Sequence, residues 1–223
     1  MVAFAAVLAL DDYVEGYDAA FLGLRFAIPL LLFLFFLSRG CYPELRDFQP
    51  GGAGALQDGL LGLTVAAVWV APYFVWPGLR PDASVRFDAA AAGQNLWPLM
   101  LGMRFVGFVV ITPFIEELLV RSYLMRAVDV YPADRDFREI PVGTFTWRSF
   151  LVTLAWFTFT HAEWEWPVAF AAGVLYNVWL YRRRHIGSLI LSHAVTNAAL
   201  FLFVVWWSAD AGADAFWNLW FFL

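Results

Sequence analysis

Long apolar runs separated by short polar loops dominate this chain. Six runs are long enough to predict helices, near residues 20–37, 56–77, 95–128, 147–163, 167–182 and 186–208. The runs are continuous, whereas the strands of a membrane barrel would alternate apolar and polar positions. The pattern therefore predicts an all-α, polytopic membrane helix bundle with about six to eight transmembrane helices.

Three of the apolar segments depart from a simple span. Residues 1–10 and 215–223 are shorter than the roughly 20 residues that a membrane-crossing helix needs. The run at 95–128 is unusually long and contains Pro113, so it predicts either one tilted helix bent at the proline or two pieces that meet there. No polar stretch is long enough to fold alone, and residues 1–223 are expected to form a single integral-membrane domain.

Composition supports the membrane assignment and narrows the chemistry. The chain is 62% hydrophobic, against roughly 45–50% for a soluble domain, so membrane lipid is the first expected partner. A net charge of -5 gives no indication of nucleic-acid binding. The one cysteine, Cys41, excludes an internal disulfide and a cysteine-cluster metal site. It lies in a polar loop without a nearby histidine, which disfavours a thiol nucleophile.

The arginines predict an orientation for the bundle. All 14 basic residues are arginine, and eight of them lie in the loops at 38–55, 129–148 and 181–187, which would share one side. The opposite loops hold only Arg80 and Arg86. Because positively charged loops stay inside, the arginine-rich side is expected to be cytoplasmic.

Polar residues recur at helical spacing inside the apolar runs. Three pairs lie four residues apart: Glu117 with Arg121, Phe157 with His161, and His193 with Asn197. Counted from the arginine-rich ends, Glu116, His161 and His193 fall at similar depths of roughly 14 to 20 Å. Ionisable groups at membrane depth are costly and usually functional, so the three helices are expected to share one polar site.

The glutamate pair at 116–117 has two different environments. Glu117 and Arg121 stack on one helical face, and each buried charge needs the other as its partner. Glu116 points about 100° away and has no helical partner. Burial would favour its neutral form, which suits a base that takes a proton from water. The alternative is an ion pair that only fixes helix packing, with Glu116 facing a water-filled pore.

The two histidine motifs suit the other steps of a hydrolysis. His161 against the Phe157 ring is a suitable partner for a carboxylate-bound water, although a histidine near a span end is also a common interfacial hydrogen-bonder. His193 and Asn197 project the same way and can both donate to a developing oxyanion, the alternative being polar contact between helices. The carboxylates nearest His161, those of Glu163 and Glu165, alternate with tryptophans and are predicted to be solvated surface.

The three motifs in order resemble a known family. The pattern E-E-x-x-x-R, F-x-x-x-H and H-x-x-x-N, over about residues 95–208, resembles the CAAX protease and bacteriocin-processing family, the Rce1-like intramembrane glutamate proteases. The resemblance implies an endopeptidase that cuts near the C-terminus of a membrane-associated peptide or protein, with or without a lipid modification. It also implies a site without metal or other cofactor.

The resemblance also implies roles for these residues. Glu116 and His161 would activate the attacking water, and His193 with Asn197 would form the oxyanion hole. The positions that would organise the site are Glu117, Arg121 and Phe157. The short length and the all-arginine basic set look like a bacterial member, which implies the bacterial inner (plasma) membrane.

The sequence departs from the family pattern in two respects. Many relatives carry Phe before the motif arginine and Gly after it, where this chain has Val120 and Ser122. These positions shape the helix surface, so the departure bears on substrate fit more than on chemistry. The predicted spans are also fewer than the eight typical of the fold.

Other readings of the same residues stay open. Glu116, His161 and His193 could make a two-histidine, one-carboxylate zinc site, which the absent H-E-x-x-H motif and the resemblance both disfavour. The chain could instead be a catalytically silent membrane scaffold or a peptide-immunity protein. A channel or transporter is disfavoured because no internal repeat symmetry is visible.

Overall fold

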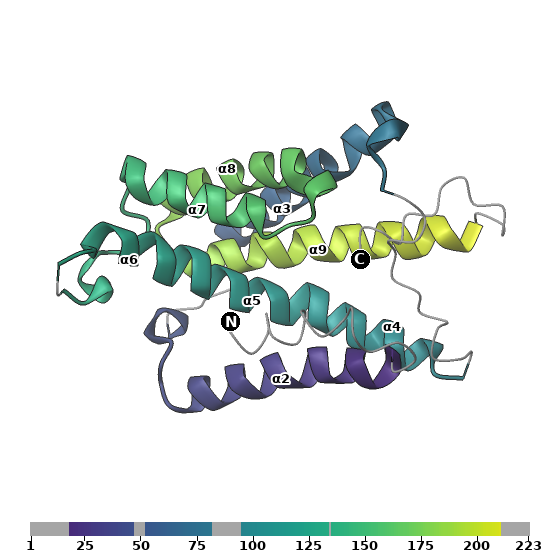
Figure 1. Ribbon diagram of the computed structural model, residues 1–223, viewed down its shortest axis with the longest axis horizontal. Helices are drawn as coiled ribbons and strands as arrows, with labels where there is room; N and C mark the ends of the chain where they lie inside the picture. Colours follow the sequence, from purple (N-terminus) through teal and green to yellow (C-terminus); the bar gives the residue numbers. More distant parts are fainter. Residues whose placement is uncertain (1–17, 47–51, 82–94, 134, 211–223) are drawn as a thin grey trace.

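The described part of the protein is a bundle of helices. The computed structural model describes residues 18–46, 52–81, 95–133 and 135–210, and this part contains helices and turns but no strand (Figure 1). The six predicted apolar runs each form a helix: α2 (Asp18–Ser38), α3 (Gly52–Val75), the long helix Trp97–Val130, α7 (Trp147–Phe159), α8 (Trp166–Arg183) and α9 (Ile186–Asp210). The all-α fold class is therefore confirmed. The apolar segments at 1–10 and 215–223 lie outside the described residues.

Three of the described helices are long and apolar enough to cross a membrane. They are Gly54–Val75, Trp97–Val130 and Ile186–Trp207, and Phe26–Ser38 adds a shorter apolar helix. Short 3-10 turns connect the helices: η2 (Pro43–Leu45), η3 (Pro77–Leu79), η6 (Phe137–Glu139) and η7 (Glu163–Glu165). The chain is an integral-membrane helix bundle.

The long third helix is continuous and carries two π-helical segments. It consists of α4 (Trp97–Phe105), η4 (Val106–Ile111), α5 (Thr112–Glu116), η5 (Glu117–Leu124) and α6 (Met125–Val130), of which η4 and η5 are π-helical. In a regular α-helix a proline has no N–H to donate, and its ring would clash with the carbonyl four residues earlier. The wider π turn of η4 ends at Ile111, two residues before Pro113. Of the two expected arrangements, one continuous helix is the one observed. Such π segments are rare and often accompany functional sites.

Helix α9 lies at the centre of the bundle, and α3 packs closely along it (Figure 1). Gly62 makes this close approach possible, because a Cβ there would lie 2.4 Å from the carbonyl oxygen of Ser192. The Thr196 hydroxyl crosses the same contact and donates to the Gly62 carbonyl at 2.9 Å. The close α3–α9 packing fixes the helix that carries His193 and Asn197.

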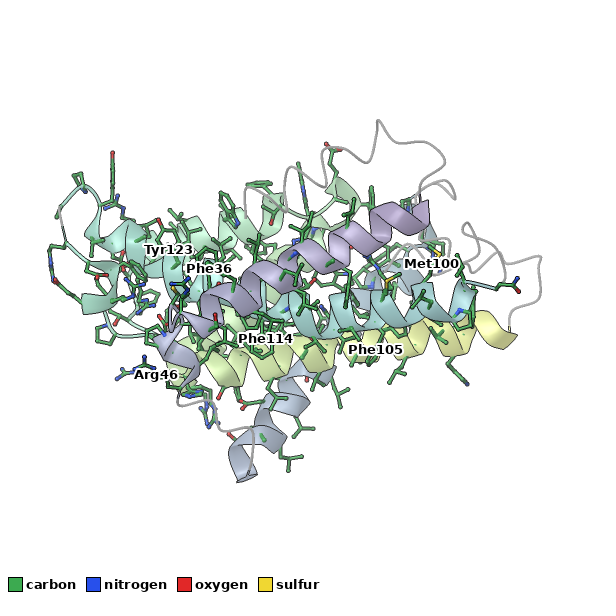
Figure 2. The ribbon with its side chains drawn as sticks, turned by 90° about the horizontal axis from the view of Figure 1, so that it is seen from below. Phe36, Arg46, Met100, Phe105, Phe114 and Tyr123 are labelled. Atoms are coloured by element: carbon green, nitrogen blue, oxygen red, sulfur yellow. The ribbon has the colours of Figure 1, made fainter. Side chains whose placement is uncertain are left out.

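Helix α2 lies across the long third helix, as Figure 2 shows from below. The rings of Phe33 on α2 and Phe114 on α5 are 5.4 Å apart. The other side of the long helix packs on α9 through Phe105 and Phe201, whose rings are 5.1 Å apart and nearly perpendicular. The helix that carries Glu116 and Glu117 is therefore held between α2 and α9.

Candidate functional site

The centre of the site is the carboxylate of Glu117, in the π segment η5. The side chain is fully buried, at 0% exposure. Its Oε1 atom lies 3.2 Å from Arg121 Nη1 and 2.7 Å from His193 Nδ1. A buried carboxylate is stable only when its charge is compensated, and two groups from two helices share that role here.

Arg121 is fixed by contacts that the sequence motifs do not contain. Its Nε donates to Asn177 Oδ1 at 3.3 Å, and Asn177 in turn donates to Thr153 Oγ1 at 3.1 Å. Its guanidinium also lies 4.3 Å from the centre of the Phe157 ring, a cation–π contact. Asn177 is fully buried in α8. In the sequence, the signal for its role is a single amide within the apolar run V-L-Y-N-V-W-L.

Glu116 faces the second nitrogen of the same histidine. Its Oε2 atom lies 4.0 Å from His193 Nε2, and its side chain is 32% exposed. This distance is too long for a direct hydrogen bond and is one that a water molecule can bridge. The His193 ring therefore lies between two carboxylates, with one nitrogen directed at each of them.

Asn197 lies one turn further along α9 and is 5% exposed. Its Nδ2 atom donates to the carbonyl oxygen of Phe108 at 2.7 Å. Phe108 belongs to the π segment η4, so this bond ties α9 to the irregular part of the long helix. An amide nitrogen carries two hydrogens, and this contact uses one of them.

His161 lies in a turn, which corrects the predicted helix at 147–163. Helix α7 ends at Phe159, because the backbone becomes extended at Ala162 before the 3-10 turn η7. The contact with Phe157 is kept even so. The two rings are 4.6 Å apart, and His161 Nδ1 lies 2.6 Å from the Phe157 carbonyl oxygen. In a neutral ring Nδ1 therefore carries the proton, and Nε2 is left as a base.

The α7–α8 turn is attached to α3 by aromatic side chains. The ring of Trp69 lies 5.4 Å from the His161 ring, and the Tyr73 hydroxyl donates to the Trp164 carbonyl at 2.7 Å. The indole N–H of Trp166 donates to the His161 carbonyl at 3.1 Å. These contacts hold His161 in place although it lies outside a helix.

The Phe157 ring lies near both histidines of the site. Its ring lies 4.6 Å from His161, 6.4 Å from His193 and 4.3 Å from the Arg121 guanidinium. The structure thus brings Glu116, Glu117, Arg121 and His193 into one polar cluster, and His161 contacts the Phe157 ring beside it.

Glu165 is a third carboxylate near the site, where the sequence predicted solvated surface. Its Oε2 atom accepts the Ala162 N–H at 3.3 Å, and the residue is partly buried, whereas Glu163 is exposed as predicted. Burial raises the pKa of Glu165 above its usual value, and the nearby Glu116 carboxylate adds to this effect. The charge of His161 and the Ala162 N–H act in the opposite direction. Glu165 is therefore close enough to Glu116 and His161 to interact with both electrostatically.

The predicted alternative of a zinc site can be compared with the side-chain arrangement. Within the described ranges, no group of three or more His, Cys, Asp or Glu side chains is arranged to hold a metal ion. In both histidines Nδ1 is already engaged: His193 Nδ1 contacts the Glu117 carboxylate, and His161 Nδ1 contacts the Phe157 carbonyl oxygen. Only Nε2 of each ring is therefore left for another partner.

Comparison with known proteins tests the family resemblance that the three motifs indicate. Residues 95–199 match the family described as type II CAAX prenyl endopeptidase, Rce1-like. This range contains all three motifs, so the predicted resemblance to the CAAX protease family is confirmed. The family indicates a membrane protease that acts on a membrane-associated peptide or protein. Comparison with curated proteins found no match, and comparison with solved structures found none either.

Proposed function

We propose that this chain is an intramembrane glutamate-type endopeptidase that uses a water activated by Glu116 and His161. The substrate is a membrane-associated peptide or protein, with or without a lipid modification, that is cut near its C-terminus. The observation that carries the proposal is the His193 ring between Glu117, at 2.7 Å, and Glu116, at 4.0 Å. The polar cluster supplies a base, a hydrogen-bond donor and the groups that orient them.

Glu116 is the group best placed to take the proton of water. It is partly exposed and has no partner on its own helix, so water reaches it while Glu117 stays enclosed. As the water oxygen bonds to the substrate carbonyl carbon, its proton passes to Glu116, and the carbonyl electron pair moves onto oxygen. The same proton then passes to the leaving amide nitrogen as the C–N bond breaks, which is general base and general acid catalysis by one residue. His161 Nε2 helps to hold the water.

His193 and Asn197 are the proposed oxyanion donors. Glu117 accepts from Nδ1 and so orients the His193 ring, and in its imidazolium form this ring can donate outward from Nε2–H. The second hydrogen of Asn197 Nδ2 completes the hole.

The proposed setting is the bacterial inner membrane with the arginine-rich loops in the cytoplasm. Pro43, Arg138 and Arg184, from the three arginine-rich loops, line one pocket, so these loops meet at the same end of the bundle. The positive-inside rule then supports a cytoplasmic location for that end. A reporter fused after Arg184 that is active only in the cytoplasm would agree with this orientation.

The test is cleavage of a quenched peptide library by the full chain in lipid nanodiscs. Wild type, Glu116→Gln and Glu163→Gln are compared with and without a strong chelator. Glu163→Gln removes an exposed carboxylate and is the matched control. We expect cleavage by wild type and the control, loss of at least about 10²-fold in Glu116→Gln, and no effect of the chelator.

The other outcomes separate the rival functions. Wild-type turnover in Glu116→Gln would remove Glu116 from the mechanism. Loss of cleavage with the chelator and recovery with zinc would support the zinc-dependent protease. Saturable binding of a peptide without cleavage would support the catalytically silent scaffold or peptide-immunity protein.

A further inference from the structure

A second polar site lies at one end of the bundle, where α6 and α8 end and α9 begins (Figure 1). It is a pocket of about 310 Å³. Its lining residues come from four separate parts of the chain: Pro43, Glu44, Arg126, Arg138, Val142, Arg184, His185 and Ile186. Three of them are arginines and one is a carboxylate, so the pocket is basic.

Arg126 is the buried part of this pocket, at 5% exposure. Its Nε donates to the Ser122 carbonyl, and its Nη2 donates to the Ser122 hydroxyl at 2.7 Å and to the Glu44 carboxylate. Its guanidinium lies 4.9 Å from the centre of the Phe137 ring. In the described part of the chain, no hydrogen bond uses Nη1, so this donor remains for a ligand. Ser122, which departs from the family pattern, thus holds two residues of this pocket, Glu44 and Arg126, in place.

The pocket holds more positive than negative charge. Arg138 lies 4.7 Å from the same Phe137 ring, so this ring brings two guanidinium groups together. Asp136 is 3.6 Å from Arg138, but both side chains are about half exposed, and such pairs are weak. Among the residues that the structure describes, Arg184 forms no ion pair. An anion would relieve the repulsion between these groups.

Glu44 does not cancel this excess. Burial alone would raise its pKa, but hydrogen bonds from its own backbone N–H, from Ser122 and from Arg126 outweigh burial and hold the pKa below its usual value. Glu44 is therefore ionised at neutral pH and offsets one arginine, Arg126. The charges of Arg138 and Arg184 remain.

The backbone at Arg184 gives an independent reason to examine this pocket. Arg184 ends α8 with φ 52° and ψ 30°, in the left-handed region, and its N–H donates to the Leu180 carbonyl at 2.7 Å. Helices commonly end in this way with glycine, because a side chain makes the conformation unfavourable. Here an arginine occupies that position, and its side chain lines the pocket.

We propose that this pocket binds a phosphate group, and that the source is the headgroup of an anionic membrane lipid. Guanidinium groups recognise phosphate through paired hydrogen bonds. Basic pockets at the ends of membrane helices, at headgroup level, bind anionic lipids. The positive end of α9, which begins at Ile186, adds to the attraction. This site does not depend on the proposed proteolytic activity.

The first experiment separates the possible sources of phosphate. The full chain in neutral detergent is titrated with phosphatidylglycerol, with phosphatidylcholine of the same acyl chains, and with inorganic phosphate, and thermal unfolding is followed by tryptophan fluorescence. We expect saturable stabilisation by phosphatidylglycerol only. Equal stabilisation by inorganic phosphate would keep the anion site but overturn the lipid source. Equal stabilisation by phosphatidylcholine would overturn both.

The variants distinguish loss of binding from loss of folding. Arg184→Gly removes a pocket charge and also relieves the backbone, so it should be at least as stable as wild type without lipid. Its affinity for phosphatidylglycerol should fall by about fivefold, and that of Arg138→Gln by a similar factor. Arg135→Gln removes an exposed arginine of the same loop that does not line the pocket, and it should bind like wild type.

Three results would overturn the proposal. Unchanged affinity in both Arg184→Gly and Arg138→Gln would show that the pocket does not hold the lipid. Equal losses in Arg135→Gln would show general surface attraction. Displacement of the lipid by a peptide with a free C-terminal carboxylate, but not by its amide, would assign the pocket to substrate binding.

Discussion

His193 donates from Nδ1 to the same Glu117 oxygen that accepts from Arg121, at 2.7 and 3.2 Å. The ion pair and the second histidine motif are thus parts of one polar cluster, joined through a carboxylate with no exposure to solvent. Glu117 sets which nitrogen of His193 carries the first proton, so in the proposed mechanism it is a positioning residue.

Arg121→Ala should strongly destabilise the protein, because Glu117 would lose its cationic partner in a buried site. We expect a loss of roughly 3 to 5 kcal/mol in the free energy of unfolding, measured by denaturation in detergent. The matched control is Arg135→Ala, which breaks an ion pair of the same four-residue spacing whose side chains are more than half exposed. That variant should lose less than about 1 kcal/mol. Similar losses in the two variants would contradict the role assigned to Arg121.

Asn197→Ala should reduce kcat by about 10² to 10³-fold while KM changes little, because an oxyanion donor acts mainly in the transition state. It should also lower stability by about 1 kcal/mol, since the Phe108 carbonyl would lose its partner. Steady-state cleavage of the best library peptide measures the first effect. A rise in KM with unchanged kcat would assign Asn197 to substrate binding instead.

Glu165 should make the stability of the protein depend on pH. Its folded-state pKa is raised above the usual 4.5, mainly by burial, so its contribution to stability is present below pH 4.5 and is lost as the pH rises through the raised value. Glu165→Gln should remove this loss of stability. As the pH rises through that range, the unfolding temperature of this variant should therefore fall less than that of wild type. Glu163→Gln, at an exposed position, should leave the pH dependence of stability as it is in wild type.

Gly62→Ala should destabilise the α3–α9 contact by about 1 to 3 kcal/mol, because the added Cβ would meet a backbone carbonyl that cannot rotate away. Gly59→Ala is the control on the same helix, where a Cβ would have no atom within 4 Å. It should be neutral or slightly stabilising, since alanine favours a helix over glycine. Thermal unfolding of both variants gives the comparison, and equal stability would contradict the close packing.

The helices were predictable from the sequence because their apolar runs are long and end at polar loops. The motif pairs were predictable for the same reason, since polar residues stand out in such runs. The end of α7 was not, because no glycine or proline stands before Pro167 to mark it. The true end depends on the extended backbone at Ala162 and on the contact of Trp164 with the distant Tyr73.

Contacts between distant residues account for the other differences. Asn177 reaches Arg121 across 56 positions, and Glu44 reaches Arg126 across 82, and neither distance follows from local spacing. Glu165 was predicted to be solvated because it follows a pattern of alternating charge and tryptophan. It is partly buried because the η7 turn brings it close to Glu116 and His161. The π segments were not predictable, because the run that contains them is apolar on most sides and its pattern does not show a change of helical period.

Because of the π segments, the geometry of the site also depends on the number of residues in the long helix. A π turn closes its hydrogen bond one residue later than an α turn, so η4 holds a residue that a plain α-helix would not need. Deleting one residue between Phe108 and Glu116 would either turn Glu117 by about 100° relative to Phe108 or remove the π turn that carries Phe108. Either change alters the geometry in which Phe108 meets Asn197 while Glu117 meets His193. A single in-frame deletion that keeps every motif residue would therefore disturb the contacts that connect the two helices.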